Sequence, residues 1–257
     1  MDSFYIKNIK INCCDLESAA DFFIKYLQLQ KPGYVCVTDV GNLINAHRNS
    51  PELKDSINNS LISLPDGRPL SVFAKLKNIK SIERVAGPDF MEEIFKKTSG
   101  TGISHFFLGD TEEVLSKLIK RILTEFDLQI AGSYSPVFGI WDKNTNDLII
   151  EKINSANPDV IWISLGGGKQ EIWMKNNYFK LKKGLMTGVG AAFRFYTGDI
   201  KRAPLFFQKA GLEWFFRLIQ QPGKMFFRYS GTLPYFIIYA IQDLFKNNQK
   251  PNKNNNT

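Results

Sequence analysis

Short apolar runs that alternate with amphipathic segments constrain the fold of this chain more than any other feature. Residues 159–165 read DVIWISL, an almost continuous apolar run, and residues 103–108 form a second one. A strand that is apolar at successive positions is buried on both faces, which is typical of parallel sheets covered by helices. We therefore predict an α/β fold, a Rossmann-like parallel sheet with helices on both faces.

Segments with helical apolar spacing lie between these runs. After Gly109, Asp110 and Thr111 can cap a helix whose apolar face comprises Val114, Leu115, Leu118, Ile119 and Ile122. Thr145 is predicted to cap a second helix, which ends at Asn157-Pro158. The other predicted strands are residues 60–64, 128–131 and 184–189; the other predicted helices are residues 16–27, a segment around 41–47 and one from about Lys169.

Composition narrows the classes of function. The chain has two histidines and three cysteines without CxxC spacing, a pattern that argues against zinc sites and Ser-His-Asp triads and favours free thiols. No apolar run reaches the roughly 18–20 residues of a spanning helix, and MDSFYIKNIK lacks the apolar region of a signal peptide. We therefore expect a cytoplasmic protein. Its net charge of +8 favours anionic partners.

The chain changes character after Gly198. Between residues 199 and 229 basic residues outnumber acidic ones and aromatic residues are interleaved: Lys201, Arg202, Lys209, Arg217, Lys224 and Arg228, with Phe206, Phe207, Trp214, Phe215, Phe216, Phe226, Phe227 and Tyr229. Such a segment fits core packing, amphipathic helices on a membrane surface or, least well, nucleic acid. We predict a core of residues 1–198, a basic amphipathic appendage of residues 199–245 that binds membrane or acceptor, and a disordered tail of residues 246–257.

Three loops follow predicted strands, where open parallel sheets bind their ligands. Pro65-Asp66-Gly67 fits either a plain turn or a general base at a strand end. Gly166-Gly167-Gly168 precedes a helix, so it fits either an ordinary connection or a diphosphate site. Residues 188–193 read GVGAAF, and such small residues allow either tight packing or close approach of a ligand.

These loops and five other segments occur in an order that resembles one family. The segments are Thr38, PDG at 65–67, ERVAGPD at 83–89, FLG at 107–109, LGGGKQEIW at 165–173, GVGAAF at 188–193, KRAP at 201–204 and GLEWFFRL at 211–218. The chain resembles the WecG/TagA/CpsF glycosyltransferases, family 26, over about residues 35–230.

The resemblance implies an inverting transfer of a sugar from a UDP-sugar to a polyprenyl-diphosphate-linked saccharide. The enzyme would be peripheral on the inner face of the cell membrane, in teichoic acid, capsule, exopolysaccharide or O-antigen type biosynthesis. No metal or other cofactor is implied, nor nucleic acid, and a homo-oligomer is left open.

Residue roles follow from the same resemblance. Asp66 matches the proposed catalytic base, and Arg217, Lys224 and Arg228 match an appendage that closes over the site and holds the lipid diphosphate. The residues expected to bind substrate are Thr38, Arg84, Gly87, Asp89, Gly166, Gly167, Lys169, Gln170, Glu171, Gly188, Gly190 and Arg194, and Arg202 is expected to join the lipid-diphosphate group.

Three departures from the family pattern stand out. Gly168 replaces the usual proline before Lys-Gln-Glu, and residues 38–41 read TDVG instead of the usual Thr-Pro/Asn-Asn-Pro. Arg194 replaces the usual aspartate after Gly-Ala-Ala-Phe, a reversal of charge. We therefore hypothesise a donor other than UDP-N-acetylmannosamine, either a hexose or an acidic sugar that pairs with Arg194.

Two other classes of function are alternatives to a glycosyltransferase. The first is a non-catalytic, membrane-associated partner in a polysaccharide assembly complex, which the presence of Asp66, Gln170 and the basic appendage argues against. The second is a nucleotide-sugar epimerase or dehydrogenase, which the missing GxGxxG and Tyr-x-x-x-Lys motifs argue against.

Overall fold

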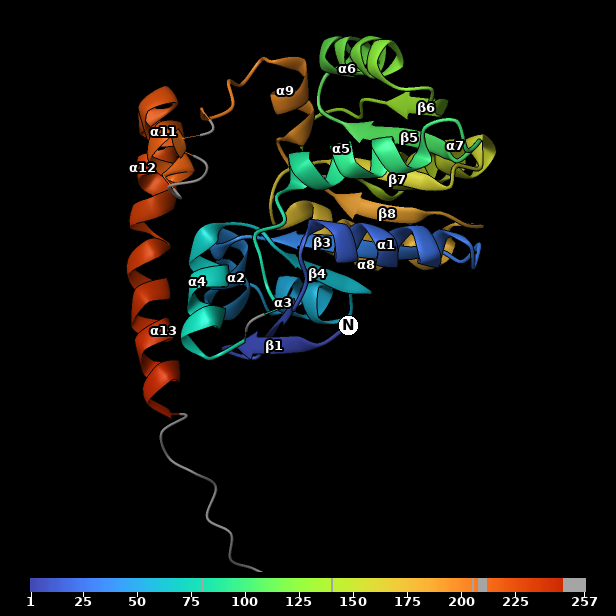
Figure 1. Cartoon of the computed structure of the whole chain (residues 1–257). Helices are drawn as coiled ribbons and strands as arrows, with labels where there is room; N and C mark the ends of the chain where they lie inside the picture. Colours follow the sequence, from blue (N-terminus) through green and yellow to red (C-terminus); the bar gives the residue numbers. More distant parts are fainter. Residues whose placement is uncertain (80, 140, 205, 208–211, 247–257) are drawn as a thin grey trace, which may run out of the picture.

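A single parallel sheet organises the protein (Figure 1). The structure is a computed structural model that describes residues 1–79, 81–139, 141–204, 206–207 and 212–246, without the side chains of Lys224 and Lys246. Six strands pair in the order β4-β3-β8-β7-β5-β6, all parallel. They are β3 (Gly33–Thr38), β4 (Ile62–Pro65), β5 (Ser104–Gly109), β6 (Gln129–Tyr134), β7 (Val160–Ser164) and β8 (Leu185–Gly188). The prediction of a Rossmann-like parallel sheet is confirmed.

Helices cover both faces of this sheet. One face packs on α2 (Val40–Arg48), α3 (Pro51–Asn58), α4 (Arg68–Leu76), α7 (Lys143–Ala156) and α8 (Lys169–Asn177), together with the antiparallel hairpin β1 (Ser3–Ile6) and β2 (Ile9–Asn12). A 3-10 turn, η1 (Tyr178–Lys180), follows α8. The other face packs on α1 (Leu16–Leu27), α5 (Gly87–Thr98), α6 (Glu112–Glu125) and α9 (Ala192–Thr197). Two apolar layers therefore enclose the strands.

The carboxyl ends of five neighbouring strands lie side by side. In strand order these ends are Pro65, Thr38, Gly188, Ser164 and Gly109. The register pairs Thr38 with Pro65 and Gly109 with Ser164, so these ends form one edge. The loops singled out in the sequence leave the sheet at this edge.

Most predicted elements are present, but one helix cap is wrong. Asp142, not Thr145, caps α7, because its carboxylate accepts a hydrogen bond from the Thr145 N–H at 2.8 Å. The patterns of the β1–β2 hairpin and of α3, α4 and α5 were not assigned from the sequence. In α5 the signal was available, since Phe90, Ile94 and Phe95 recur at helical spacing and are buried.

Within the described residues, three helices of eight residues or more follow residue 198 (Figure 1). They are α11 (Glu213–Gln220), α12 (Pro222–Ser230) and α13 (Leu233–Lys246), and α13 lies along α2 and β1. The Phe236 side chain is buried in the apolar layer of the core. The Arg48 guanidinium lies 3.5 Å from the centre of the Tyr235 ring. Lys209, Gly211 and the predicted tail from residue 247 lie outside the described residues.

Candidate active site

A cavity of about 650 Å³ opens along the carboxyl edge of the sheet. Residues at the ends of five strands line it, and so do side chains of α11 and α12. Its predicted lining residues are Asp66, Gly166, Gly167, Gln170, Gly190, Arg194, Arg217 and Arg228. The structure therefore brings together residues that lie far apart in the sequence, in the place where parallel sheets bind ligands.

Asp66 occupies the position directly after β4. Its N–H donates a hydrogen bond to the Thr38 carbonyl at 2.9 Å, which fixes the turn, and its side chain is 30% exposed. Burial raises the pKa of Asp66 to about 6, with Arg84 opposing the rise and Asp39 and Glu213 adding to it. Asp66 is thus mostly ionised near neutral pH and more basic than an ordinary carboxylate, as a general base requires.

Arg84 lies beside Asp66 but does not line the cavity. Its Nε is 3.7 Å from an Asp66 carboxylate oxygen, and its Nη1 is 4.0 Å from Asp89. Its Nη2 is 2.6 Å from a carboxylate oxygen of Glu213 on α11. One guanidinium therefore connects the candidate base to the appendage.

The glycine loop between β7 and α8 is built around a buried carboxylate. Glu171 is completely buried and accepts hydrogen bonds from the Gly168 N–H at 2.7 Å, from Gln170 Nε2 at 3.0 Å and from Asn42 Nδ2 at 3.2 Å. Burial raises the pKa of Glu171 to about 7. Glu171 is not among the residues that line the cavity, and its hydrogen bonds hold this loop in place.

Gln170 is the side chain that Glu171 orients toward the cavity. Its Oε1 accepts a hydrogen bond from the Gly190 N–H at 3.2 Å, which ties the α8 loop to the loop after β8. A Cβ at Gly188 would lie 2.7 Å from Gln170 Nε2, so the glycine makes room for this side chain. The small residues of the GVGAAF segment thus serve packing at Gly188, while Gly190 lines the cavity.

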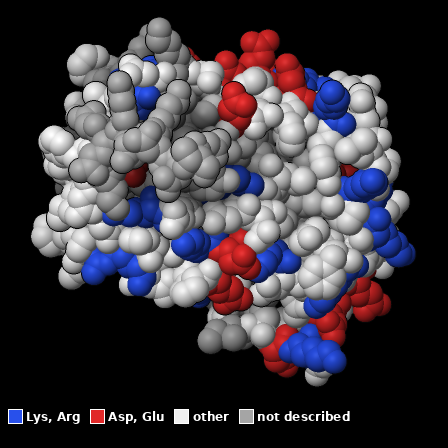
Figure 2. All heavy atoms as spheres, turned by 90° about the horizontal axis from the view of Figure 1, so that it is seen from below, with Lys and Arg blue, Asp and Glu red and all other residues white. Residues whose placement is uncertain are grey.

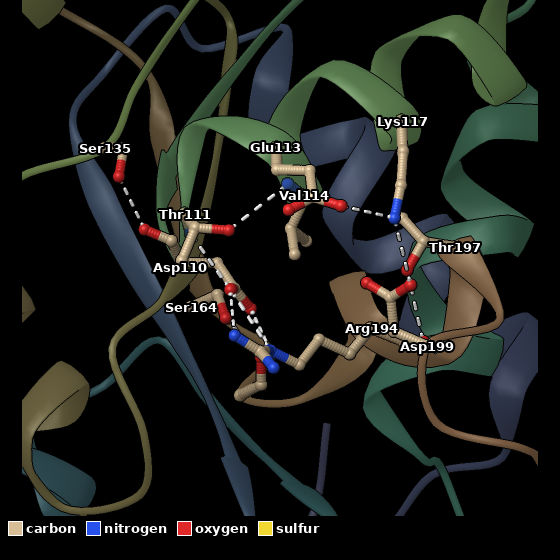
Figure 3. Close-up of polar contacts among 11 residues, drawn as sticks. Asp110, Thr111, Glu113, Val114, Lys117, Ser135, Ser164, Arg194, Thr197 and Asp199 are labelled. Atoms are coloured by element: carbon tan, nitrogen blue, oxygen red, sulfur yellow. Dashed lines mark hydrogen bonds and ion pairs between the residues drawn. The ribbon is translucent and has the colours of Figure 1, made fainter.

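Arg194 lines the cavity and is already paired (Figure 3). Its Nε lies 2.9 and 3.1 Å from the two carboxylate oxygens of Asp110, and its Nη2 lies 2.7 Å from one of them. The Asp110 side chain is only 7% exposed, whereas that of Arg194 is 41% exposed. Among the described residues Nη1 of Arg194 has no hydrogen-bond partner. The guanidinium is therefore held by one edge and offers the other to the cavity.

The appendage contributes cations to the same cavity. Arg217 on α11 and Arg228 on α12 line it; Arg228 pairs with Asp39, and Arg217 lies 5.2 Å from the centre of the Phe195 ring. Lys224 lies on α12, and its side chain is outside the described part of the chain. Arg202 pairs with Asp89, away from the cavity.

Eight predicted site residues, seven for substrate binding and Arg202 for the lipid diphosphate, do not line the cavity. They are Thr38, Arg84, Gly87, Asp89, Lys169, Glu171, Gly188 and Arg202. Thr38 is fully buried and exchanges a hydrogen bond with the Ser63 hydroxyl at 2.9 Å. Gly87 permits close packing, since a Cβ there would lie 3.0 Å from the Val189 carbonyl oxygen.

Other cavity residues were not predicted. Asp39, Asn42, Asp110, Phe138, Gln221 and Met225 line the cavity. A signal existed for Asp39 and Asp110, because each directly follows a strand that ends at the same edge. Nothing local in the sequence marks Phe138, whose ring is 76% exposed.

The described residues contain no group of three or more His, Cys, Asp or Glu side chains arranged to hold a metal ion. None of the helices in the described part of the chain is long and apolar enough to span a membrane. On the face shown in Figure 2, lysine and arginine side chains are interspersed with acidic ones. The arginines that line the cavity, and not that surface, therefore favour an anionic ligand.

The family comparison agrees with the order of these loops. The family model described as the glycosyl transferase WecG/TagA/CpsF family matches residues 4–250, nearly the whole chain. The match includes the sheet, the glycine loop and the helices α11, α12 and α13. This protein belongs to the WecG/TagA/CpsF family of glycosyl transferases.

Proposed function

We propose that the protein transfers a sugar from a UDP-sugar to a saccharide carried on polyprenyl diphosphate, in the synthesis of a cell-surface polysaccharide. The observation that carries the proposal is Asp66, a partly buried carboxylate with a raised pKa that faces a cavity lined by arginines. The Asp66 carboxylate accepts the proton of the acceptor hydroxyl. That oxygen bonds to the anomeric carbon while the bond from this carbon to the diphosphate breaks, and UDP leaves with the electron pair.

The strand order supports one direction for the donor along the cavity. Asp66 follows the edge strand β4, the glycine loop follows β7, and Asp110 follows β5. In a UDP-sugar the diphosphate lies between the sugar and the nucleoside. With the sugar at Asp66, the diphosphate lies over the middle strands, and the nucleoside reaches Arg194 and the exposed ring of Phe138.

The pairing of Arg194 with Asp110 changes the hypothesis about the donor. An acidic sugar would need a cation with unpaired charge, but Asp110 already neutralises Arg194. The guanidinium of Arg194 also contacts Asp110, which follows β5, and β5 lies on the far side of the glycine-loop strand β7 from the strand that precedes Asp66. We therefore favour a neutral sugar in the donor and a contact of Arg194 with the nucleoside.

The leaving diphosphate needs positive charge around it. Arg217 and Arg228 line the cavity, and the N-terminus of α8 begins directly after Gly166 and Gly167. Backbone N–H groups at a helix N-terminus and guanidinium groups both stabilise developing negative charge on phosphate oxygens. We propose that these groups stabilise the departing UDP and that transfer continues in the presence of a chelator.

Exposed apolar side chains of the appendage support binding at a membrane surface. They are Trp214, Phe215, Ile219, Phe226, Phe227, Ile237, Ile238, Ile241 and Phe245. Amphipathic helices with such side chains and basic groups bind the headgroup region of a bilayer. An enzyme bound there would meet an acceptor whose lipid lies in the same bilayer.

The test measures UDP release from a panel of UDP-sugars, with a short-chain polyprenyl-diphosphate-linked N-acetylglucosamine acceptor and EDTA present. Acceptor-dependent release with one donor, lost in Asp66→Asn but kept in the control Asp147→Asn on the exposed face of α7, is expected. Full activity of Asp66→Asn would contradict the role of the base. Failure to bind UDP by calorimetry, with no release from any donor, would favour the non-catalytic partner.

A further inference from the structure

Three carboxylates from three different elements surround one guanidinium. Arg84 lies between Asp66 at the end of β4, Asp89 on α5 and Glu213 on α11, and Glu213 is the nearest at 2.6 Å. The Asp66 carboxylate, at 3.7 Å, is beyond hydrogen-bond distance from the same guanidinium. Glu213 therefore has the direct contact with Arg84, and the candidate base has only a longer ionic one.

Glu213 reaches this position with the appendage. Two more ion pairs join the same parts of the chain, Arg202 with Asp89 and Arg228 with Asp39. The contact of Glu213 with Arg84 thus exists only while α11 lies against the core. If α11 moved away, Arg84 would keep Asp66 and Asp89 as its remaining acidic neighbours.

We propose that Glu213 is a positioning residue of the active site, which holds Arg84 off Asp66 when α11 is docked. In the docked enzyme the Asp66 carboxylate is free to accept the proton of the acceptor hydroxyl. With α11 away, Arg84 pairs with Asp66 and weakens it as a base. The inference rests on the proposed function of Asp66. It makes the ability of Asp66 to accept a proton depend on the docking of α11.

The charges around Asp66 determine in which direction its pKa changes when Glu213 is replaced. The charged groups that face Asp66 are Arg84 and Arg217, which lower its pKa, and Asp39 and Glu213, which raise it. Removing the charge of Glu213 lowers the pKa of Asp66 directly, and it also frees Arg84 to approach. The base is then ionised at lower pH but accepts a proton less readily.

The experiment compares the pH dependence of kcat/KM for UDP release in the full-length enzyme and in Glu213→Gln. We expect the midpoint of the acidic limb to fall by about 0.5–1 pH unit and the plateau to fall by about 3–10-fold. The control is Glu83→Gln, which removes an exposed charge next to Arg84 and should leave the midpoint in place. A lower plateau with an unmoved midpoint would overturn the inference, because Glu213 would then only hold α11 against the core without changing the pKa of Asp66.

Two further variants keep the test decisive. If Glu213→Gln does not fold, Glu213→Asp withdraws the carboxylate from Arg84 without removing its charge; a smaller shift in the same direction supports the inference and an unmoved midpoint overturns it. Asp66→Asn separates the two proposals. Transfer by Asp66→Asn would refute the base itself, whereas an inactive Asp66→Asn with an unmoved Glu213→Gln midpoint would refute only the role of Glu213.

Discussion

The parallel sheet and the helices α11, α12 and α13 are held in place by different forces. In β7 the side chains from Val160 to Ile163 are completely buried between two apolar layers. In contrast, α11 buries no residue among those described, and the buried apolar side chains of α12 and α13 are Met225 and Phe236. Ion pairs such as Lys77 with Asp243 add to the attachment.

This difference matters for the active site. The core supplies Asp66 and the glycine loop on rigid strand ends, whereas the appendage supplies Arg217, Arg228 and Glu213. A segment attached largely through partly exposed charges opens at lower free-energy cost than a segment of the core. The part of the candidate site that the core supplies is therefore fixed by the sheet, whereas the part that the appendage supplies depends on the docking of α11 and α12.

The largest expected effect is on the core. Phe95 is fully buried and its ring contacts those of Phe107, Phe126, Trp162 and Tyr196. Phe95→Ala should lower the free energy of unfolding by about 3–5 kcal/mol, measured by urea denaturation. In the appendage the Phe227 side chain is 79% exposed, so Phe227→Ala should change the free energy of unfolding by less than about 0.5 kcal/mol. Similar losses in the two variants would contradict the contrast between the regions.

The next effect concerns the buried carboxylate of the core loop. Burial raises the pKa of Glu171 to about 7 in the folded protein, from the ordinary 4.5 of a glutamate, so the folded state holds a proton that the unfolded state releases. The stability that this group contributes is present below about pH 4.5 and is lost as the pH rises to 7, by about 2–3 kcal/mol.

Glu171→Gln isolates this effect. Between pH 4.5 and 7 the unfolding free energy of the variant should rise relative to that of the native protein, because glutamine cannot ionise. Above pH 8 the difference between the two should be constant. Urea denaturation across this range measures it. Taking the difference cancels the opposite contribution of buried His105, whose pKa is lowered to about 4. A difference that does not vary with pH would contradict the buried, protonated state.

A smaller effect is expected on membrane binding. Phe227→Ala should weaken binding to vesicles that contain anionic lipid by about ten- to a hundredfold, since burying one phenyl ring contributes about 1.5–3 kcal/mol. Co-sedimentation with vesicles measures this. Phe179→Ala removes an equally large ring, 64% exposed, from η1 on the core and should bind like the native protein. Equal loss in both variants would place the membrane contact elsewhere.

The smallest effect probes how the appendage is attached. Lys77, directly after α4, and Asp243 on α13 form an ion pair with side chains 13% and 23% exposed. A double-mutant cycle with Lys77→Ala and Asp243→Ala should give a coupling free energy of about 0.5–1.5 kcal/mol. The coupling should shrink in 1 M salt, because salt screens partly exposed pairs. A coupling that is independent of salt would point to apolar packing instead.

Local patterns predicted the strands well and the site residues less completely. The strands predicted from the apolar runs at β5 and β7 are confirmed. A strand buried on both faces has apolar residues at successive positions, which the sequence alone reveals. The assignment of residues to the cavity depends on which side of each loop faces it. Thr38, Lys169 and Glu171 are each next in sequence to a lining residue but do not line the cavity.

By itself, the sequence determined the parallel sheet and the loops at its carboxyl edge, because apolar runs and glycine turns act over a few neighbouring residues. The tertiary structure alone decided which charges meet. The pairs of Asp110 with Arg194 and of Arg84 with Glu213 join residues from distant segments. Their contact depends on the strand order and on the docking of α11, since an ion pair needs two groups within about 4 Å and no local pattern specifies that distance.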